Sequence, residues 1–395
     1  MDIFAKCYEP STADQVRELG IYPYFHALES RQDTEVIMEG KRRIMLGSNN
    51  YLGLTTHPAV IEAGIRAFEQ YGSGCSGSRF LNGTLRLHQE LESELAQFLH
   101  KEAVVTFSTG FQSNLGIISA IAGRGDYIIM DRENHASLYD GCRLSFGKML
   151  RYAHNDMPDL EKKLQSVPEG AGSLIVTDGV FSMGGDIANL PEICRLAKQY
   201  GARVMVDDAH GLGVIGEGGR GTASYYGLEN EVDIYMGTFS KSLASLGGYM
   251  AAPARVVDYV RHTSRPFIFS ASITPASCAS ALQALKILEA HPELSETLQA
   301  RALFMRGKLR EAEIRMRPSN GECIPIIPIY TYEAIPTLQI ARELYDRGVY
   351  VNSSLPPAAA PGECLLRTSL MATHSEVLIE EAVGIIADVL HEHQI

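Results

Sequence analysis

Residues 203–210 of this 395-residue chain read RVMVDDAH, an apolar run that ends in two acids and an imidazole. The apolar residues follow one another without polar alternation, which is typical of a strand buried on both faces. Strands of this kind occur in mostly parallel sheets that helices cover on both sides. The stretch therefore predicts an α/β fold.

Further short apolar runs lie on both sides of this stretch, with longer helical or polar segments between them. They span residues 103–107, 127–131, 174–178, 233–238 and 248–252. A helical pattern covers residues 191–200, and Gly201 follows it as a stop signal. This alternation of strands and helices predicts a large, doubly wound α/β domain.

The pattern changes after about residue 280. There the sequence predicts helices over residues 281–290, 294–314 and 375–391, and strands over 324–332 and 364–370. The chain before residue 46 has a predicted hairpin around Gly40 but no apolar pattern large enough for a core. We predict three parts: an N-terminal segment (1–45), a large α/β domain (46–280) and a smaller C-terminal α+β domain (281–395).

Composition excludes several classes of protein. Hydrophobic residues make up 45% and charged residues 21%, as in soluble globular proteins, and the net charge of −12 disfavours nucleic acid as a partner. The seven cysteines show no C-x-x-C spacing, so neither a zinc site nor a redox motif is indicated. No secretory signal and no apolar run of about 18 residues is visible. We expect a cytoplasmic protein; transient docking on a membrane stays open.

Three other signals are weak. Residues 72–77 and 211–216 both match G-x-G-x-x-G, but the first follows a helical pattern and the second runs into further glycines. A dinucleotide site needs a strand before the glycines and a helix after them, so we interpret both as tight loops. His391 and His393 lie at the end of the last predicted helix without a third ligand nearby, so no metal site is predicted.

Polar side chains follow the predicted strands where each one ends. Asp207 and His210 end one strand, and Lys241 follows another, beside Thr238 and Ser240. Because parallel strands present their carboxyl ends at one edge of the sheet, these residues are expected to meet there. Pyridoxal phosphate needs a lysine for a Schiff base, a carboxylate for its ring nitrogen and donors for its phosphate. The ordered set predicts this cofactor.

The motifs also resemble those of the α-oxoamine synthases, fold-type I pyridoxal phosphate enzymes. The resemblance runs from about Tyr22 to the C-terminus and rests on SNNYLGL (48–54), GSRFLNGT (77–84), STGF (108–111), NHAS (134–137), DDAH (207–210), GTFSK (237–241) and LRTSLMATH (366–374). It implies a fold-type I transferase and a homodimer with shared active sites. It also implies decarboxylative condensation of an amino acid with an acyl-CoA.

The resemblance further implies roles for individual residues. Lys241 corresponds to the Schiff-base lysine, Asp207 to the partner of the ring nitrogen and His135 to the residue stacked on the ring. His210 and Ser182 would contact the phenolic oxygen, and Asn49 and Arg367 would bind the substrate carboxylate. The phosphate would be held by Gly110, Phe111, Thr238 and Ser240, helped by Ser272 and Thr274 of a second subunit.

Within the family, the lysine motif is most similar to the branch that condenses L-serine with a long-chain acyl-CoA to 3-ketodihydrosphingosine. Residues 206–221 are equally similar to the branch that makes 8-amino-7-oxononanoate for biotin. Glycine C-acetyltransferase activity is a further alternative. A catalytically silent regulatory homologue would be expected to lose the lysine or its acid partner, and Lys241, Asp207 and His135 are all present.

Overall fold

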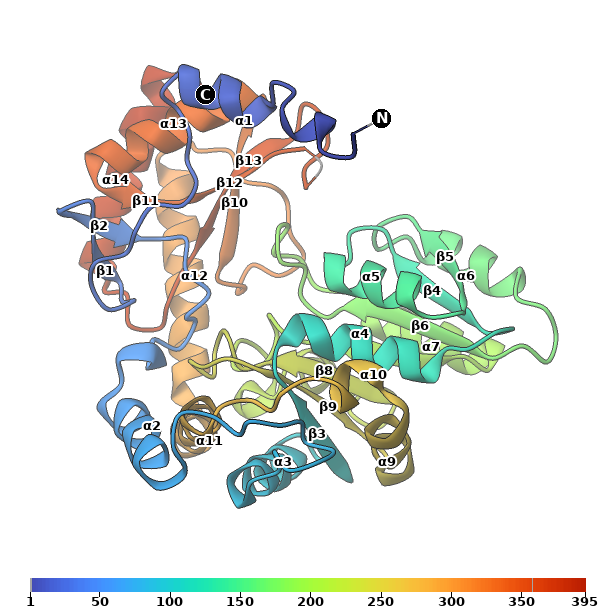
Figure 1. The fold of residues 1–395 in the computed structure, drawn as a ribbon. Coiled ribbons are helices and arrows are strands. Elements are labelled where there is room, and N and C mark those ends of the chain that lie inside the picture. Colours follow the sequence, from blue (N-terminus) through green and yellow to red (C-terminus); the bar gives the residue numbers. More distant parts are fainter. Residues whose placement is uncertain (1, 357) are drawn as a thin grey trace.

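The structure is a computed structural model that describes residues 2–356 and 358–395. Its centre is a seven-stranded sheet with the order β3-β9-β8-β7-β6-β4-β5 (Figure 1). The strands are β3 (Ala103–Phe107), β4 (Tyr127–Asp131), β5 (Lys148–Tyr152), β6 (Ser173–Asp178), β7 (Arg203–Asp207), β8 (Ile234–Thr238) and β9 (Gly248–Ala252). Only β9 runs antiparallel to its neighbours in this sheet, so the predicted mostly parallel sheet is confirmed.

Both faces of the sheet are buried, as the apolar run at β7 predicts. Val204 and Val206 point into one hydrophobic cluster, whereas Met205 points into the cluster on the other face. The helices of the first cluster include α3 (Arg86–Phe98), α6 (Met157–Gln165), α7 (Leu190–Tyr200) and α11 (Pro275–Ala290). Those of the second are α4 (Gly110–Ile121), α5 (Ala136–Leu144), α9 (Ala254–Thr263) and α10 (Arg265–Ile268).

Strand β5 was not among the predicted strands. It lies at the edge of the sheet, where Lys148 and Arg151 are exposed, and its sequence shows no continuous apolar run. An edge strand contacts only one neighbour, here β4, so fewer of its side chains must be apolar. The remaining elements around the sheet are α2 (Pro58–Tyr71), α8 (Thr222–Tyr225) and the short turns η2 (Leu54–Thr56) and η3 (Glu217–Gly219).

The C-terminal part forms a second hydrophobic core around a sheet of order β10-β13-β12. Its elements are α12 (Glu293–Glu311), β10 (Ile326–Tyr332), α13 (Ala334–Arg347), β11 (Val349–Tyr350), β12 (Asn352–Ser354), β13 (Cys364–Ser369) and α14 (Glu376–Glu392). The sequence did not predict α13, β11 and β12. It placed the end of α12 at residue 314, three residues beyond Glu311.

The predicted hairpin around Gly40 is confirmed as β1 (Glu35–Met38) and β2 (Lys41–Met45). Strand β2 also pairs with β11, so this N-terminal hairpin packs on the C-terminal part of the chain (Figure 1). Before it come η1 (Ala5–Cys7) and α1 (Thr12–Glu18). The division into three parts at residues 45 and 280 stays a prediction.

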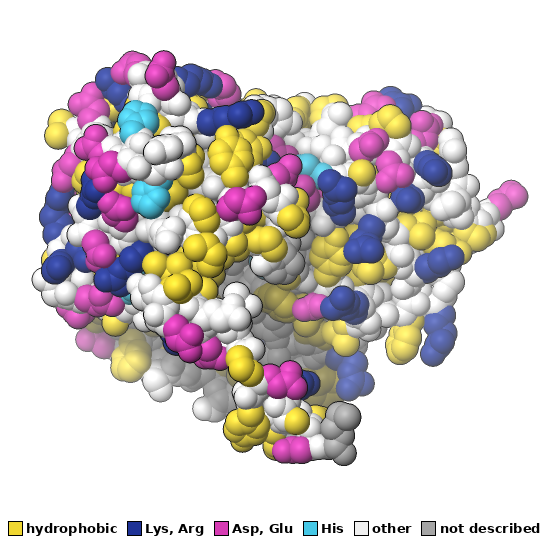
Figure 2. Space-filling model, turned by 90° about the horizontal axis from the view of Figure 1, so that it is seen from above, with side chains coloured by type: hydrophobic (Ala, Val, Ile, Leu, Met, Phe, Trp, Pro, Cys, Tyr) yellow, Lys and Arg dark blue, Asp and Glu magenta, His cyan; other side chains and the backbone are white. Residues whose placement is uncertain are grey.

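Basic and acidic side chains are interspersed over the face drawn in Figure 2. Within the described residues, no helix is long and apolar enough to cross a membrane. No group of three or more metal-ligating side chains occurs among them either, and His393 instead lies 2.9 Å from the Glu343 carboxylate.

Candidate active site

A cavity of about 250 Å³ lies at the carboxyl ends of the central strands. Nine of the predicted site residues line it: Gly110, Phe111, His135, Ser182, Asp207, His210, Thr238, Ser240 and Lys241. They come from the last residues of β7 and β8 and from the segments after β3, β4, β6, β7 and β8, which the sheet brings to one edge.

The environment of Lys241 favours the neutral form of its amine. Burial lowers the pKa of Lys241 to about 8, although the charges of Asp207 and Asp178 oppose the change; Arg367 adds to the lowering. Close to pH 8, a large share of the amine is therefore unprotonated. Only the unprotonated amine can attack a carbonyl or accept a proton.

Asp207 is buried and held by two donors. The N–H of Ala209 donates to its Oδ1 at 3.0 Å, and Nδ2 of Asn114 donates to its Oδ2 at 2.7 Å. Nδ2 of Asn114 also donates to Oγ of Ser137 at 2.8 Å, whereas its Oδ1 has no partner within the part of the chain that the structure describes. Asn114 orients the carboxylate, and sequence reasoning missed it because a lone amide within α4 carries no motif.

His135 is the N-cap residue that precedes α5, and it lies on the cavity wall. Its Nδ1 is 2.7 Å from Oγ of Ser137, and its backbone N–H donates to Oδ2 of Asp178 at 3.0 Å. Burial lowers the pKa of the imidazole, with Lys241 also lowering it and Asp207 opposing. A neutral, oriented aromatic ring is suited to stacking on another planar ring.

A polar cluster joins the two predicted carboxylate-binding residues to His210. Arg367 donates from Nη2 to Oδ1 of Asn49 at 2.9 Å and from Nε to the carbonyl of Ser182 at 2.5 Å. The hydroxyl of Tyr51 lies 2.6 Å from Nδ1 of His210. Tyr51, although inside the quoted SNNYLGL motif, was assigned no role from the sequence, and the structure places it between His210 and Arg367.

Arg367 is buried yet has no acidic partner among the residues that the structure describes. Only 4% of its surface is exposed, and Arg367 takes part in none of the ion pairs among the described residues. A buried guanidinium is stable when an anion or several acceptors compensate it, and here Asn49, Ser182 and, at 3.5 Å, Tyr51 supply only neutral acceptors. This arrangement suits a carboxylate ligand, which a planar guanidinium can bind with two parallel hydrogen bonds.

The first turn of α4 presents backbone N–H donors to the cavity beside Thr238. Gly110 and Phe111 start this helix, so their N–H groups have no acceptor within it. The hydroxyls of Thr238 and Ser240 lie 2.8 Å from each other. A Cβ on Gly110 would lie 2.9 Å from Oγ1 of Thr238, so a side chain there would crowd this wall.

Ser272 and Thr274 do not line the cavity of their own chain. The hydroxyl of Ser272 donates to the carbonyl of Gly83 at 2.7 Å, and Thr274 caps the start of α11. Their contribution across a subunit boundary stays a prediction.

Comparison with known proteins agrees with the geometry. The family model for class I and II aminotransferases matches residues 41–386. Serine palmitoyltransferase of Sphingobacterium spiritivorum is 52% identical over 94% of this chain and 92% of its own length. 8-Amino-7-oxononanoate synthase of Geobacter sulfurreducens is 44% identical over 94% of this chain and 95% of its own.

A solved structure of a serine palmitoyltransferase variant from S. paucimobilis, with a bound pyridoxal phosphate–myriocin aldimine, is 36% identical. It superposes with a TM-score of 0.96 over 99% of both chains. The chain therefore belongs to the class I and II aminotransferases and, within them, to the α-oxoamine synthase family.

Proposed function

We propose that this chain binds pyridoxal phosphate and condenses L-serine with a long-chain acyl-CoA, such as palmitoyl-CoA, with loss of carbon dioxide. The product is 3-ketodihydrosphingosine, so the reaction is the first step of sphingolipid synthesis. The observation that carries the proposal is the meeting of Lys241, Asp207 and His135 in one cavity, beside a buried Arg367 with no acidic partner among the described residues. The similarity to serine palmitoyltransferases selects serine and a long acyl chain.

The residues of the cavity fit this cofactor. Asp207 is a fixed carboxylate for a protonated ring nitrogen, and His135 offers a neutral planar face. The first turn of α4 and the hydroxyls of Thr238 and Ser240 supply donors for a phosphate. When bound, pyridoxal phosphate supplies an electron sink for the charge that develops at the α-carbon of the amino acid.

The protein's own groups perform the remaining work. The Lys241 amine would hold the cofactor, and in its neutral form it would accept the α-proton of the amino acid at Nζ. The Asp207 carboxylate would hold a proton on the ring nitrogen and so stabilise negative charge that moves into the ring. Arg367 and Asn49 bind the substrate carboxylate, which orients the α-carbon within the cavity until that carboxylate leaves as carbon dioxide.

We expect Arg367→Ala to weaken serine binding while leaving cofactor affinity within about twofold. Losing one partner of a desolvated charge pair costs ~2–5 kcal/mol, which corresponds to a roughly thirtyfold or larger rise in the dissociation constant. Serine titration of the cofactor-loaded protein, followed by visible absorbance, measures this constant. Arg367→Lys, which keeps the charge but loses the planar fork, should recover only part of the affinity. A variant that loses the cofactor yet keeps its serine affinity would contradict the role of Arg367.

The activity itself is tested by comparing substrate pairs on the purified protein. Serine with palmitoyl-CoA should give a higher kcat/KM than glycine with acetyl-CoA or alanine with pimeloyl-CoA, measured as CoA release. Each buried methylene of an acyl chain contributes about 0.8 kcal/mol, so an enzyme that buries a palmitoyl chain should discriminate strongly against acetyl. If alanine with pimeloyl-CoA is the best pair, the chain is an 8-amino-7-oxononanoate synthase and the sphingolipid assignment is wrong. If no pair releases CoA, the protein is better interpreted as a catalytically silent regulatory homologue.

Two further parts of the proposal concern assembly and location. The protein acts as a homodimer in the cytoplasm, with Ser272 and Thr274 of each subunit reaching the phosphate site of the other. The exposed apolar side chains of Phe111 and Leu246 beside the cavity support a partner surface there. Light scattering of the purified protein reports the mass in solution, and a monomer that is fully active would contradict shared sites.

A further inference from the structure

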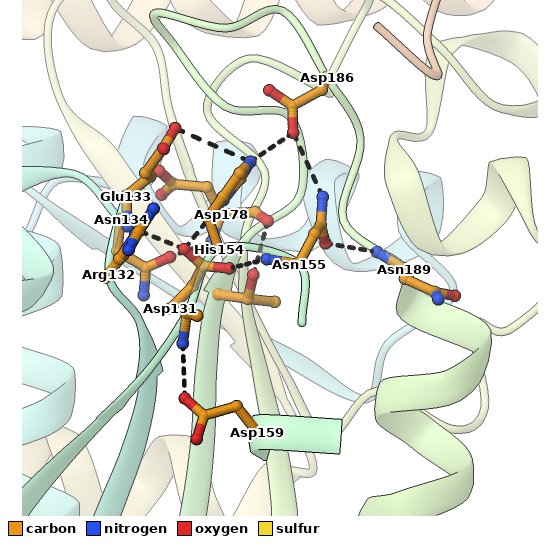
Figure 3. A network of polar contacts seen from close by, with 12 residues as sticks. Asp131, Arg132, Glu133, Asn134, His154, Asn155, Asp159, Asp178, Asp186 and Asn189 are labelled. Carbon is orange, nitrogen blue, oxygen red and sulfur yellow. Dashed lines mark hydrogen bonds and ion pairs between the residues drawn. The ribbon is translucent and has the colours of Figure 1, made fainter. Parts of the chain in front are cut away.

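His154 lies outside the cavity, yet two of the loops that form the cavity meet at its side chain (Figure 3). It follows the edge strand β5, and 13% of its side chain is exposed. Its Nδ1 is 3.0 Å from Oδ1 of Asp131, and its Nε2 is 2.8 Å from Oδ2 of Asp186. No step of the reaction described above uses this group.

The geometry fixes the charge of the imidazole. An ionised carboxylate only accepts hydrogen bonds, so each ring nitrogen of His154 must donate one to its carboxylate. A neutral imidazole carries a single N–H and can satisfy only one of the two. With both carboxylates ionised, His154 is therefore an imidazolium between Asp131 and Asp186. Burial alone would lower the pKa of His154, but hydrogen bonds and charges from the two carboxylates raise it to about 10.

The first carboxylate holds the turn that leads to His135. Asp131 ends β4 and is fully buried, and its oxygens also accept the N–H groups of Glu133 and Asn155, each at 2.8 Å. His135, four residues after Asp131, lies at the end of this turn on the cavity wall. The position of the His135 segment therefore depends on a carboxylate whose charge His154 neutralises.

The second carboxylate holds the loop between β6 and α7, residues 179–189, which carries Val180 and Ser182 on the cavity wall. Oδ2 of Asp186 accepts from His154 and, at 3.2 Å, from Nδ2 of Asn155, whereas its buried Oδ1 has no partner within the described residues. The ring of Phe181, the residue before Ser182, packs edge-on against His154 with centroids 4.5 Å apart. Without the imidazolium, Asp186 would keep one neutral donor, which leaves a buried charge poorly compensated.

We propose that His154 is a positioning residue: its imidazolium joins Asp131 to Asp186, and thereby fixes the His135 turn and the 179–189 loop relative to each other. The inference deepens the proposed function, because the two segments carry His135 and Ser182, the residues assigned to the cofactor ring and its phenolic oxygen. It needs only that the cavity binds pyridoxal phosphate, whichever acyl-CoA is used.

The protonation state is tested directly on the full chain with ¹⁵N-labelled histidine. We expect one imidazole to keep both nitrogens protonated from pH 7 to pH 9, and its signal to vanish in His154→Gln. A singly protonated His154 at pH 7 would overturn the proposal, because it could not bind both carboxylates as a donor.

The positioning role is tested by cofactor titration of the apoprotein. His154→Gln should weaken pyridoxal phosphate binding about fivefold or more and lower kcat about tenfold or more. The matched control is His393→Gln, which removes another histidine–carboxylate pair at 2.9 Å, neither member of which lines the cavity, and should change neither. If His154→Gln lowers only the unfolding temperature, with cofactor affinity and kcat within twofold, His154 is structural and the proposal fails. Wild-type protein that binds the cofactor but releases no CoA would refute the proposed function alone.

Asp186→Asn provides a second variant if His154→Gln does not fold. It leaves His154 with Asp131 and removes the buried charge that needs the imidazolium. Cofactor affinity should again fall about fivefold or more, because the 179–189 loop has lost its charged link. Unchanged affinity would overturn the proposal.

The pH dependence of stability has a defined sign. The charged groups that face His154 are Asp131, Asp186 and Glu133. The Glu133 carboxylate lies 3.8 Å from Nε2 of His154 and forms an ion pair with Arg317 at 3.2 Å. Because folding raises the pKa of His154, its stabilising contribution is complete below the unfolded value near 6.5 and is lost as pH rises through about 10. The unfolding temperature of wild type should therefore exceed that of His154→Gln most near pH 6.5, and the gap should shrink toward pH 10. A gap that does not change with pH would contradict the charged state.

Discussion

Replacement of Lys241 by alanine is expected to abolish turnover, with kcat reduced by at least about a thousandfold. The reason is that Lys241 supplies both the amine that holds the cofactor aldehyde and the base that takes the α-proton. Burial lowers its pKa to about 8, so a large share of the amine is available for both roles close to pH 8. Borohydride reduction followed by peptide mapping should leave the cofactor on the Lys241 peptide of wild type and on no peptide of the variant.

Two further variants serve as controls. One tests whether the positive charge of Lys241 is enough without a free amine, and the other tests whether loss of any lysine lowers activity. Lys241→Arg keeps a cation in the cavity but has no unprotonated nitrogen near neutral pH, so it should be as inactive as Lys241→Ala. Lys286→Ala removes an exposed lysine that pairs with Glu90 and should leave kcat unchanged. Activity in Lys241→Ala within tenfold of wild type would show that another group bonds to the cofactor.

The sequence could predict the centre of the site because the fold brings strand ends together in a regular way. Asp207 ends β7 and Thr238 ends β8, three residues before Lys241, and parallel pairing of the two strands brings these ends to one edge. A periodic apolar pattern is enough to locate such ends along the chain. The predicted strands therefore also located the cavity.

The residues around this centre were missed because their contacts join distant parts of the chain. Tyr51 and His210 are 159 positions apart, and Asn114 and Asp207 are 93 apart. His154 follows the edge strand β5, whose partly exposed residues give no apolar run. A polar side chain whose hydrogen-bond partners lie far away in the chain leaves no periodic trace in the sequence, so these partners become visible only in the folded structure.

The second large effect is expected for Asp207→Asn, which should lower kcat by about a hundredfold or more with little change in fold. The carboxylate lies among fixed donors, so the charge that keeps the ring nitrogen protonated is preorganised, and removing one such group typically costs 10²–10³ in rate. Asparagine has the same shape. The side-chain amide of Asn114 can rotate to present its otherwise unpartnered Oδ1 to the new amide, so the local hydrogen bonds can be restored.

The neighbouring acid is the matched control for this charge. Asp208 accepts hydrogen bonds from the N–H and the hydroxyl of Thr222 and does not line the cavity. Asp208→Asn should therefore lower the unfolding temperature while keeping the cofactor affinity and kcat of the folded protein. Asp207→Asn should instead lower kcat and leave the unfolding temperature nearly unchanged. Steady-state kinetics and thermal unfolding of both variants measure the two effects separately. A kcat for Asp207→Asn within about twofold of wild type would mean that a different acid, with Asp178 the nearest candidate across β6 and β7, holds the ring proton.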